Sequence, residues 1–306
     1  MDELVTTYIA SSGNEYWLND VILSDSDAIL TKSVNYHDYG WEPETIDRRM
    51  GATVTNFGKK PAKYKAKLYL RGTPEERRAK TDALHNDFDR DIANKTPGQI
   101  LWHVFPEDRT MPEVREFIDC YIISSSTYDE ESMSRTVNDI VIYCPYPMWY
   151  KPISRNYSGT GRLTPSQFLD YDYDYAYDFT NTIYGADTLP NDSAFPAHFK
   201  LHFIGRNDDG PADITNPVVW IAGHTYGVLG TIRANEWVEI DSKAKTVTYV
   251  KNGTTKINWF DRRTKQESVF TQIPPGDVPI AWGGDIYVNI ILYAERSEPK
   301  WASSIS

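Results

Sequence analysis

The sequence predicts a mainly β protein built from two β-sandwich domains, the first of which carries one α-helix. The chain has 306 residues, enough for two domains of about 150 residues that each bury a core. Most apolar residues fall in short runs bounded by Gly, Pro, Asn or Asp, as is typical of strands. One stretch, at about residues 73–94, has instead the spacing and the end signals of a helix.

The chain divides into an N-terminal domain of residues 1–150, a linker and connecting strand of residues 151–180, and a C-terminal domain of residues 181–306. The first domain ends in Cys144-Pro-Tyr-Pro-Met-Trp-Tyr150. Two prolines there lack an amide donor and restrict the residue before them, so we expect a corner. Residues 151–168 are rich in Ser, Thr, Gly and Pro, which indicates a linker.

The composition, with 40% hydrophobic and 25% charged residues, is that of an ordinary globular protein. The net charge of −11 argues against nucleic-acid binding, which needs a basic surface. The sequence has no apolar run of about 18 residues and no basic and apolar leader, so we expect neither a membrane-spanning helix nor a signal peptide. Cys120 and Cys144 lie in strand-like runs and are expected to be buried, reduced thiols in a protein made in the cytoplasm.

The first half should consist of short strands around the helix. Apolar and aromatic residues concentrate there in runs that Gly, Pro, Asp or Ser interrupt. The first two of these runs, residues 15–23 and 28–34, are close enough in sequence to form a hairpin or a meander. The expected strands are residues 15–23, 28–34, 64–70, 99–105, 116–124 and 134–144.

Both ends of the helix are marked in the sequence. Thr73 is a favourable N-cap, Pro74 occupies the first helical position, and Glu76 completes a capping box. Asn94 and the dipeptide Pro97-Gly98 should end the helix.

Leu84, Phe88 and Ile92 recur every fourth residue and should form the buried stripe of this helix. The rest of its circumference is charged, so we expect a surface helix that lies on a sheet. Its role as a packing lid is the simpler interpretation, and a contact between subunits is the alternative.

The two halves meet in a segment where aromatic residues alternate with Asp or Ala over residues 169–179. In an extended chain this alternation places five rings on one face and the aspartates on the other. We therefore expect a connecting strand with one face that packs on a neighbour and one face in water.

The same segment also permits a calcium interpretation. Asp170, Asp172 and Asp174 match positions 1, 3 and 5 of an EF-hand loop. The loop also requires Gly at its sixth position and Glu at its twelfth, where this sequence has Tyr175 and Asn181. The mismatch favours the connecting strand over a metal site.

The second half should be entirely β. Its strands are short and regularly spaced, and no helical pattern interrupts them, which favours a β-sandwich of the jelly-roll type. Asn252-Gly253 is the strongest hairpin signal in the chain, and residues 280–282 and 285–293 should form a last hairpin. The expected strands are residues 196–203, 213–221, 226–232, 237–241, 245–250, 280–282 and 285–293.

The search for catalytic chemistry gives a negative result. His198 and His202 have a spacing that suits metal ligands on a helix, but on a strand they stand roughly 13 Å apart and cannot share one ion. The sequence contains neither a Gly-x-Ser-x-Gly elbow nor a P-loop. We predict no catalytic, metal-binding or cofactor-binding residues.

Aromatic residues leave a binding role open. Sandwich domains often present Trp or Tyr faces to sugars, although a place in the core is the simpler interpretation for each ring. The candidates in the second half are Trp220, Tyr226, Trp237 and Trp259.

Several features occur in a characteristic order. They are the helix after Arg71-Gly-Thr-Pro74, the corner at Cys144-Pro-Tyr-Pro-Met-Trp149, the Tyr/Asp alternation over 170–179, Asn216-Pro217 in a strand, Trp237-Val-Glu-Ile-Asp241, the Asn252-Gly253 hairpin and Phe270-Thr-Gln-Ile-Pro-Pro-Gly276. Together they resemble the distal tail proteins of long non-contractile bacteriophage tails, the Dit family. The resemblance covers most of the chain and rests on element order alone over the first 60 residues.

The resemblance implies a structural protein without a cofactor or enzymatic activity. In that family an N-terminal β-sandwich with one helix forms a hexameric ring, and a galectin-like C-terminal β-sandwich decorates the outside. The ring joins the tail tube protein to the tail-tip (tail-associated) protein and can anchor receptor-binding proteins. We therefore expect a homo-hexamer in the virion, at the distal end of the phage tail, synthesised in the cytoplasm of the bacterial host.

DNA passes through the lumen of such a ring without specific binding. Six chains with a net charge of −11 each carry −66, which would keep DNA from adhering to the ring in transit.

Two other classes of protein remain possible at this stage. A carbohydrate-binding module for host cell-wall polysaccharide would be retained on that polysaccharide through its second domain. A polysaccharide-cleaving enzyme would turn over cell-wall glycans. A structural ring predicts neither result and predicts self-assembly instead.

Overall fold

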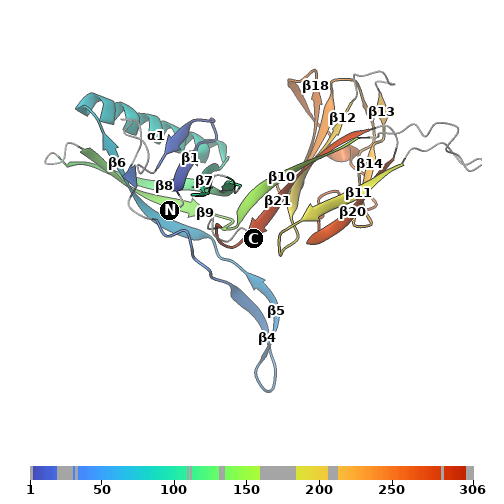
Figure 1. The fold of residues 1–306 in the computed structure, drawn as a ribbon, viewed down its shortest axis with the longest axis horizontal. Helices are drawn as coiled ribbons and strands as arrows, with labels where there is room; N and C mark the ends of the chain where they lie inside the picture. The colour runs from blue at the N-terminus through green and yellow to red at the C-terminus, as the bar shows by residue number, and fades with distance from the viewer. Residues whose placement is uncertain are drawn as a thin grey trace, which may run out of the picture. The chain divides into compact units, whose positions relative to one another are not determined.

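The fold, described from a computed structural model, is mainly β with two compact units (Figure 1). Unit 1 comprises Met1–Lys151 with Arg296–Ser306, and unit 2 comprises Pro152–Glu295. The expectation of a mainly β chain with one α-helix is confirmed. The structure describes residues 3–18, 30–31, 34–108, 110, 112–130, 135–158, 184–205, 213–283 and 286–300.

The strands of unit 1 are antiparallel and belong mostly to two sheets, in the orders β2-β1-β7-β8 and β3-β6-β9-β8. The unit contains β1 (Glu3–Ile9), β2 (Glu15–Trp17), β3 (Leu30–Thr31), β4 (Glu42–Asp47), β5 (Ala52–Gly58), β6 (Ala62–Arg71), β7 (Gly98–Phe105), β8 (Val114–Glu130), β9 (Arg135–Cys144) and the start of β10 (Trp149–Ser158).

Both sheets share the long strand β8. Its first part, up to Cys120, pairs with β7, and its second part, from Tyr121, pairs with β9. The register shifts between Ile122 and Ser124, which is the mark of a β-bulge. A bulge bends the strand and increases its twist, so β8 can leave one sheet and continue in the other.

The core of unit 1 lies between these sheets and contains an aromatic centre. Tyr36 packs edge-on against Trp102 and Trp149, with ring centroids 6.0 and 5.6 Å away. Cys120 and Cys144 are buried and free, as expected, and burial raises the pKa of both thiols. Both cysteines therefore act as small core residues.

The helix α1 (Pro74–Asn94) begins where the sequence predicts. The Thr73 hydroxyl accepts a hydrogen bond from the Glu76 amide at 3.3 Å, and Glu76 Oε2 accepts one from the Thr73 amide at 2.8 Å. This is the predicted capping box. The helix ends at Lys95, which adopts the left-handed conformation (φ 53°).

The buried stripe of α1 differs from the prediction at one position. Leu84 and Phe88 are buried as expected, but Ile92 is 47% exposed, so its assignment to the stripe was wrong. The aspartates Asp87 and Asp91 are buried instead. Apolar spacing alone could not identify them, because both are held by polar partners.

The partners of these aspartates come from β1, β2 and the turn between them. Asp91 accepts hydrogen bonds from the Tyr8 hydroxyl and the Ser11 amide. Asp87 accepts from Ser12 Oγ, Asn14 Nδ2 and the Tyr16 hydroxyl. Burial opposes the charge on Asp87, but these hydrogen bonds outweigh it and lower its pKa. The two carboxylates thus fasten the helix to the first hairpin.

Residues 296–300 also belong to unit 1 and are bound through their main chain. Trp102 Nε1 donates to the carbonyl of Lys300 at 3.1 Å, and Lys59 Nζ donates to the carbonyl of Ser297 at 3.0 Å. The chain therefore returns to its first unit after completing the second.

Glu116 of β8 holds the same segment and is only 2% exposed. Its Oε2 accepts from the Lys300 amide at 2.8 Å, and its Oε1 lies 3.7 Å from Arg296 Nη1. Burial raises the pKa of Glu116 despite these favourable contacts.

Unit 2 is a β-sandwich whose two sheets enclose one core. The larger sheet has the order β19-β18-β17-β12-β21-β10, and the smaller has the order β11-β20-β14-β15. The strands are β11 (Tyr184–Asn191), β12 (His198–Ile204), β13 (Ile214–Thr215), β14 (Val218–Ile221), β15 (His224–Gly227), β16 (Thr231–Ile232), β17 (Trp237–Asp241), β18 (Thr246–Lys251), β19 (Thr255–Asn258), β20 (Gly276–Gly283) and β21 (Tyr287–Arg296), with one 3-10 turn, η3 (Phe260–Arg262).

Two hairpin predictions for unit 2 have opposite outcomes. The hairpin at Asn252-Gly253 is confirmed: both residues have positive φ, and β18 pairs with β19. The expected hairpin of residues 280–282 with 285–293 is wrong. β20 pairs with β11 and β14 in the smaller sheet, whereas β21 pairs with β12 in the larger sheet. The chain changes sheets between them.

The revised helix face gives a direct stability test. Phe88→Ala should lower the free energy of unfolding by about 3–5 kcal/mol, because it leaves a cavity under α1. Ile92→Ala, on the same helix but exposed, should change it by no more than about 0.5 kcal/mol. Urea unfolding of both variants measures the difference. Equal losses of unfolding free energy in the two variants would show that Ile92 is part of the core.

A pH series tests the buried carboxylate. The raised folded-state pKa of Glu116 means that, between the unfolded and folded pKa values, the folded protein binds more protons than the unfolded chain. The parent should therefore lose stability, relative to Glu116→Gln, as the pH rises from about 4.5 through the folded pKa. Thermal melts of parent, Glu116→Gln and the exposed control Glu75→Gln measure this. A parent-to-variant difference that stays constant over this window would contradict it.

Candidate assembly surface

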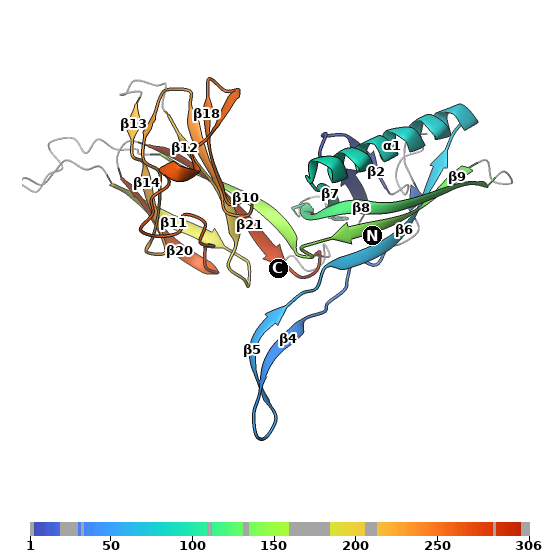
Figure 2. The same ribbon diagram turned by 180° about the vertical axis from the view of Figure 1, so that it is seen from behind.

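The hairpin of β4 and β5 is an arm that projects beyond the other strands of unit 1 (Figure 1, Figure 2). All residues from Glu42 to Phe57 are exposed, including the side chains of Met50 (94%) and Phe57 (56%). An isolated two-stranded hairpin is at best marginally stable in water, and clustered exposed apolar groups mark contact surfaces. The arm therefore has the character of a contact surface.

The two faces of the arm differ in chemistry. Pro43 pairs with Phe57, and Thr45 pairs with Val54, so Pro43, Val54 and Phe57 share one face, which we call the apolar face. The opposite face carries acidic groups, of which Glu42 pairs with Lys60 at 2.8 Å. Ile46 also lies on this opposite face, so the arm has most of its apolar side chains, but not all of them, on the apolar face.

A second surface of unit 1 is the outward face of β6, β9 and β8. Lys63, Lys65 and Lys67 alternate along β6 with buried residues and all point outward. Arg135 lies over the ring of Tyr69, 4.4 Å from its centroid. This face is basic although the chain as a whole is acidic.

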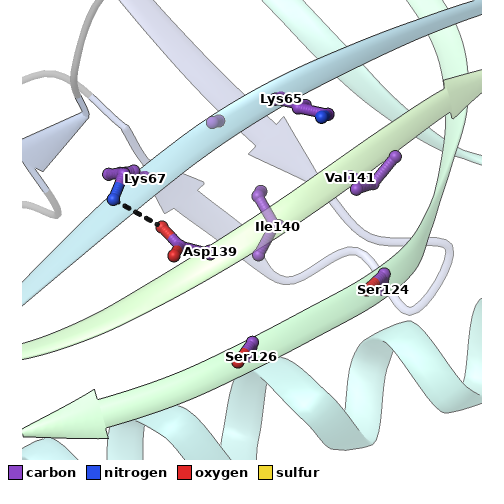
Figure 3. A pocket seen from close by; sticks show the side chains of 8 residues that line it. Lys65, Lys67, Ser124, Ser126, Asp139, Ile140 and Val141 are labelled. Carbon is purple, nitrogen blue, oxygen red and sulfur yellow. Dashed lines mark ion pairs between the residues drawn. The ribbon is translucent and has the colours of Figure 1, made fainter.

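A groove of about 520 Å³ lies on this face (Figure 3). Lys67 Nζ pairs with Asp139 Oδ1 across its edge at 3.3 Å. Such a mixture of ammonium, carboxylate and hydroxyl groups can form ion pairs and hydrogen bonds with a protein surface. The groove is lined by Lys65, Ala66, Lys67, Ser124, Ser126, Asp139, Ile140 and Val141.

The residues singled out from the sequence for metal chemistry do not come together. His198 Nδ1 lies 3.2 Å from Ser242 Oγ, whereas His202 contacts other partners. Within the ranges that the structure describes, no group of three or more His, Cys, Asp and Glu side chains could hold a metal ion. Asp170, Asp172 and Asp174, like the whole connecting strand of residues 169–179, lie outside the described residues.

The four aromatic candidates separate into two groups. Tyr226 and Trp259 are buried in the core of unit 2, which agrees with the simpler interpretation of these rings as core residues. Trp220 on β14 and Trp237 on β17 are half-buried. Only the latter two rings reach the surface.

The arm and the basic face were both absent from the sequence prediction. Alternating lysines on a predicted strand could have indicated a solvent-facing side at residues 63–67. The segments Glu42–Asp47 and Ala52–Gly58 gave no comparable signal, because neither has a buried face.

In the part of the chain that the structure describes, no helix combines the length and apolar character required to span a membrane.

Comparison with solved structures finds similar folds at low sequence identity. SPP1 Dit (gp 19.1), described as a paradigm of hub adsorption apparatus in Gram-positive infecting phages, matches with a TM-score of 0.56 and 10% identity over 96% of this chain and 99% of that chain. Chains of the phage P2 baseplate with Ca and the phage p2 baseplate with Sr, both in the activated conformation, match with TM-scores of 0.62 and 0.60 at 9% and 10% identity, over 97% of this chain and 99% of each. No protein-family model and no curated protein matches the sequence.

Over nearly its whole length, the chain therefore has the fold of a component of a phage adsorption apparatus or baseplate. SPP1 Dit is one protein with this fold, and it belongs to the family that the sequence features resemble. The expected resemblance is confirmed at the level of the fold.

Proposed function

We propose that this chain is the structural hub of a phage tail tip, in which six copies form a ring that joins the tail tube to the tail-tip protein. The observation that carries this proposal is the match to SPP1 Dit over 96% of this chain and 99% of that one. Both units, in the same order within one chain, take part in that match. A protein that shared only a common sandwich domain would match over one unit.

The surfaces of unit 1 support ring formation. A closed ring of identical chains requires heterologous contacts, in which each copy meets its neighbour through two different surfaces. The apolar face of the β4–β5 arm supplies one such surface, and the outward face of β6, β9 and β8 is a candidate for the other. Covering the arm would also remove the aggregation hazard of an exposed hairpin edge.

The remaining roles follow from the proposed ring. Unit 2 would anchor receptor-binding proteins, while the tail tube and tail-tip proteins would bind the two sides of the ring. DNA would pass through the lumen without specific binding, which agrees with the net charge of −11 per chain. The ring would be part of the virion, at the distal end of the tail, after synthesis in the host cytoplasm. We propose no catalytic role for any residue.

Arm variants test the proposed contact. Val54→Asp with Phe57→Asp places two charges on the apolar face, and we expect it to abolish assembly in concentrated protein, because the charges would be buried unpaired. Asn56→Asp, on the opposite face of the arm, is the matched control and should still assemble. Light scattering gives the mass of each species, and a thermal melt checks that each variant is folded. A double variant that assembles like the parent would rule out the apolar face as a contact.

A further inference from the structure

A row of polar side chains crosses the outward face of the larger sheet in unit 2. Glu239 of β17, His202 of β12 and Asn289 of β21 are direct cross-strand neighbours, and Thr248 of β18 pairs with Glu239 on its other side. The residues that alternate with them along each strand are buried in the core, so the row faces outward. At strand spacing it spans roughly 14 Å, the length of a short oligosaccharide.

Hydrogen bonds fix the orientation of these side chains. His202 Nε2 lies 3.0 Å from Glu239 Oε2, and His202 Nδ1 lies 2.9 Å from Asn289 Oδ1. Asn289 Nδ2 donates to Ser154 Oγ at 2.9 Å and to Asn156 Oδ1 at 2.7 Å. The row therefore continues onto β10 and is organised before any ligand arrives.

Both ring nitrogens of His202 face oxygen atoms, and a protonated ring can donate to both of them. Burial opposes this charge, but the hydrogen bonds to Glu239 and Asn289 outweigh it and raise the pKa of His202. The bond from His202 in turn lowers the pKa of Glu239. Glu239 is thus a charged acceptor whose position is fixed.

Aromatic side chains flank the row on the same face. Trp237 and Tyr287 lie two residues before Glu239 and Asn289 on their strands, and Ile204 lies between them as the cross-strand neighbour of both. All three are half-buried. An indole and a phenol ring therefore adjoin the polar row.

This arrangement fits a sugar better than a protein. The centre of a protein interface is apolar and depleted of charged residues, whereas here the charged pair lies at the centre and the apolar groups at its side. If this row were an ordinary solvent-exposed face, its charged side chains would be largely exposed. The His202 and Glu239 side chains are instead only 16% and 28% exposed. Sugars present hydroxyls at the ring edge and apolar C–H groups on the ring face, which match planar polar groups and aromatic rings.

We propose that this face of unit 2 binds a neutral glycan, with a sugar ring on Trp237 and a sugar hydroxyl that donates to Glu239. Lys200, whose Nζ lies 3.5 Å from Asp241 Oδ2 and 3.9 Å from Glu239 Oε2, supplies a donor at the edge of the site. The inference is independent of ring formation, since every residue in it belongs to unit 2.

The test uses the full chain and three soluble probes: lactose, maltotriose and triacetylchitotriose. Saturation-transfer NMR at millimolar sugar should detect binding of at least one probe to the parent. Glu239→Gln, nearly isosteric, should weaken that binding about tenfold, the loss for one charge-assisted hydrogen bond. Trp237→Leu should weaken it further by removing the ring.

Asp277→Asn, which removes an exposed carboxylate from the smaller sheet, is the matched control and should bind like the parent. Thermal melts confirm that each variant is folded. Failure of the parent to bind any of the three probes would overturn the proposal and leave the face to a protein partner. Binding that Glu239→Gln leaves unchanged would also overturn it, because the sugar would then lie elsewhere.

Discussion

The long strand β8 holds unit 1 together, since it pairs with β7 in one sheet and with β9 in the other. Because one strand pairs in both sheets, a continuous backbone that bends at the bulge between Ile122 and Ser124 joins the two layers. Its first part carries Glu116, which binds the returning chain, and its second part supplies Ser124 and Ser126 to the groove. The covalent continuity of β8 therefore fixes the C-terminal segment and the basic face relative to each other.

The features that the sequence predicted correctly are those whose causes are local. The capping box of Thr73 and Glu76 and the turn at Asn252-Gly253 each depend on a few adjacent residues, and both appear as expected. The misassigned Ile92 shows the limit of this reasoning. Asp91 is buried in its place, and it accepts a hydrogen bond from the hydroxyl of Tyr8, which lies 83 residues earlier in the chain.

The polar row of unit 2 could not be predicted because it arises from long-range pairing. Glu239, His202 and Asn289 are far apart in sequence and become neighbours only when β17, β12 and β21 align in register. The strands of the arm were not predicted for a different reason. Neither strand has a buried face, so neither shows the alternation of apolar and polar residues that identifies a strand in a sequence. Conversely, the predicted pairing of β20 with β21 failed because adjacency in sequence does not decide which sheet a strand joins.

We propose that unit 1 forms the contacts between copies and that unit 2 recognises a ligand. The apolar arm and the basic face of unit 1 suit contacts between copies, whereas the organised polar row of unit 2 suits a small ligand. Imaging of assembled phage tails that carry a label on this chain tests whether the chain is the hub of the tail tip. We expect the label at the junction of tail tube and tail tip, arranged with sixfold symmetry. Label found elsewhere on the virion, or none in purified tails, would contradict it.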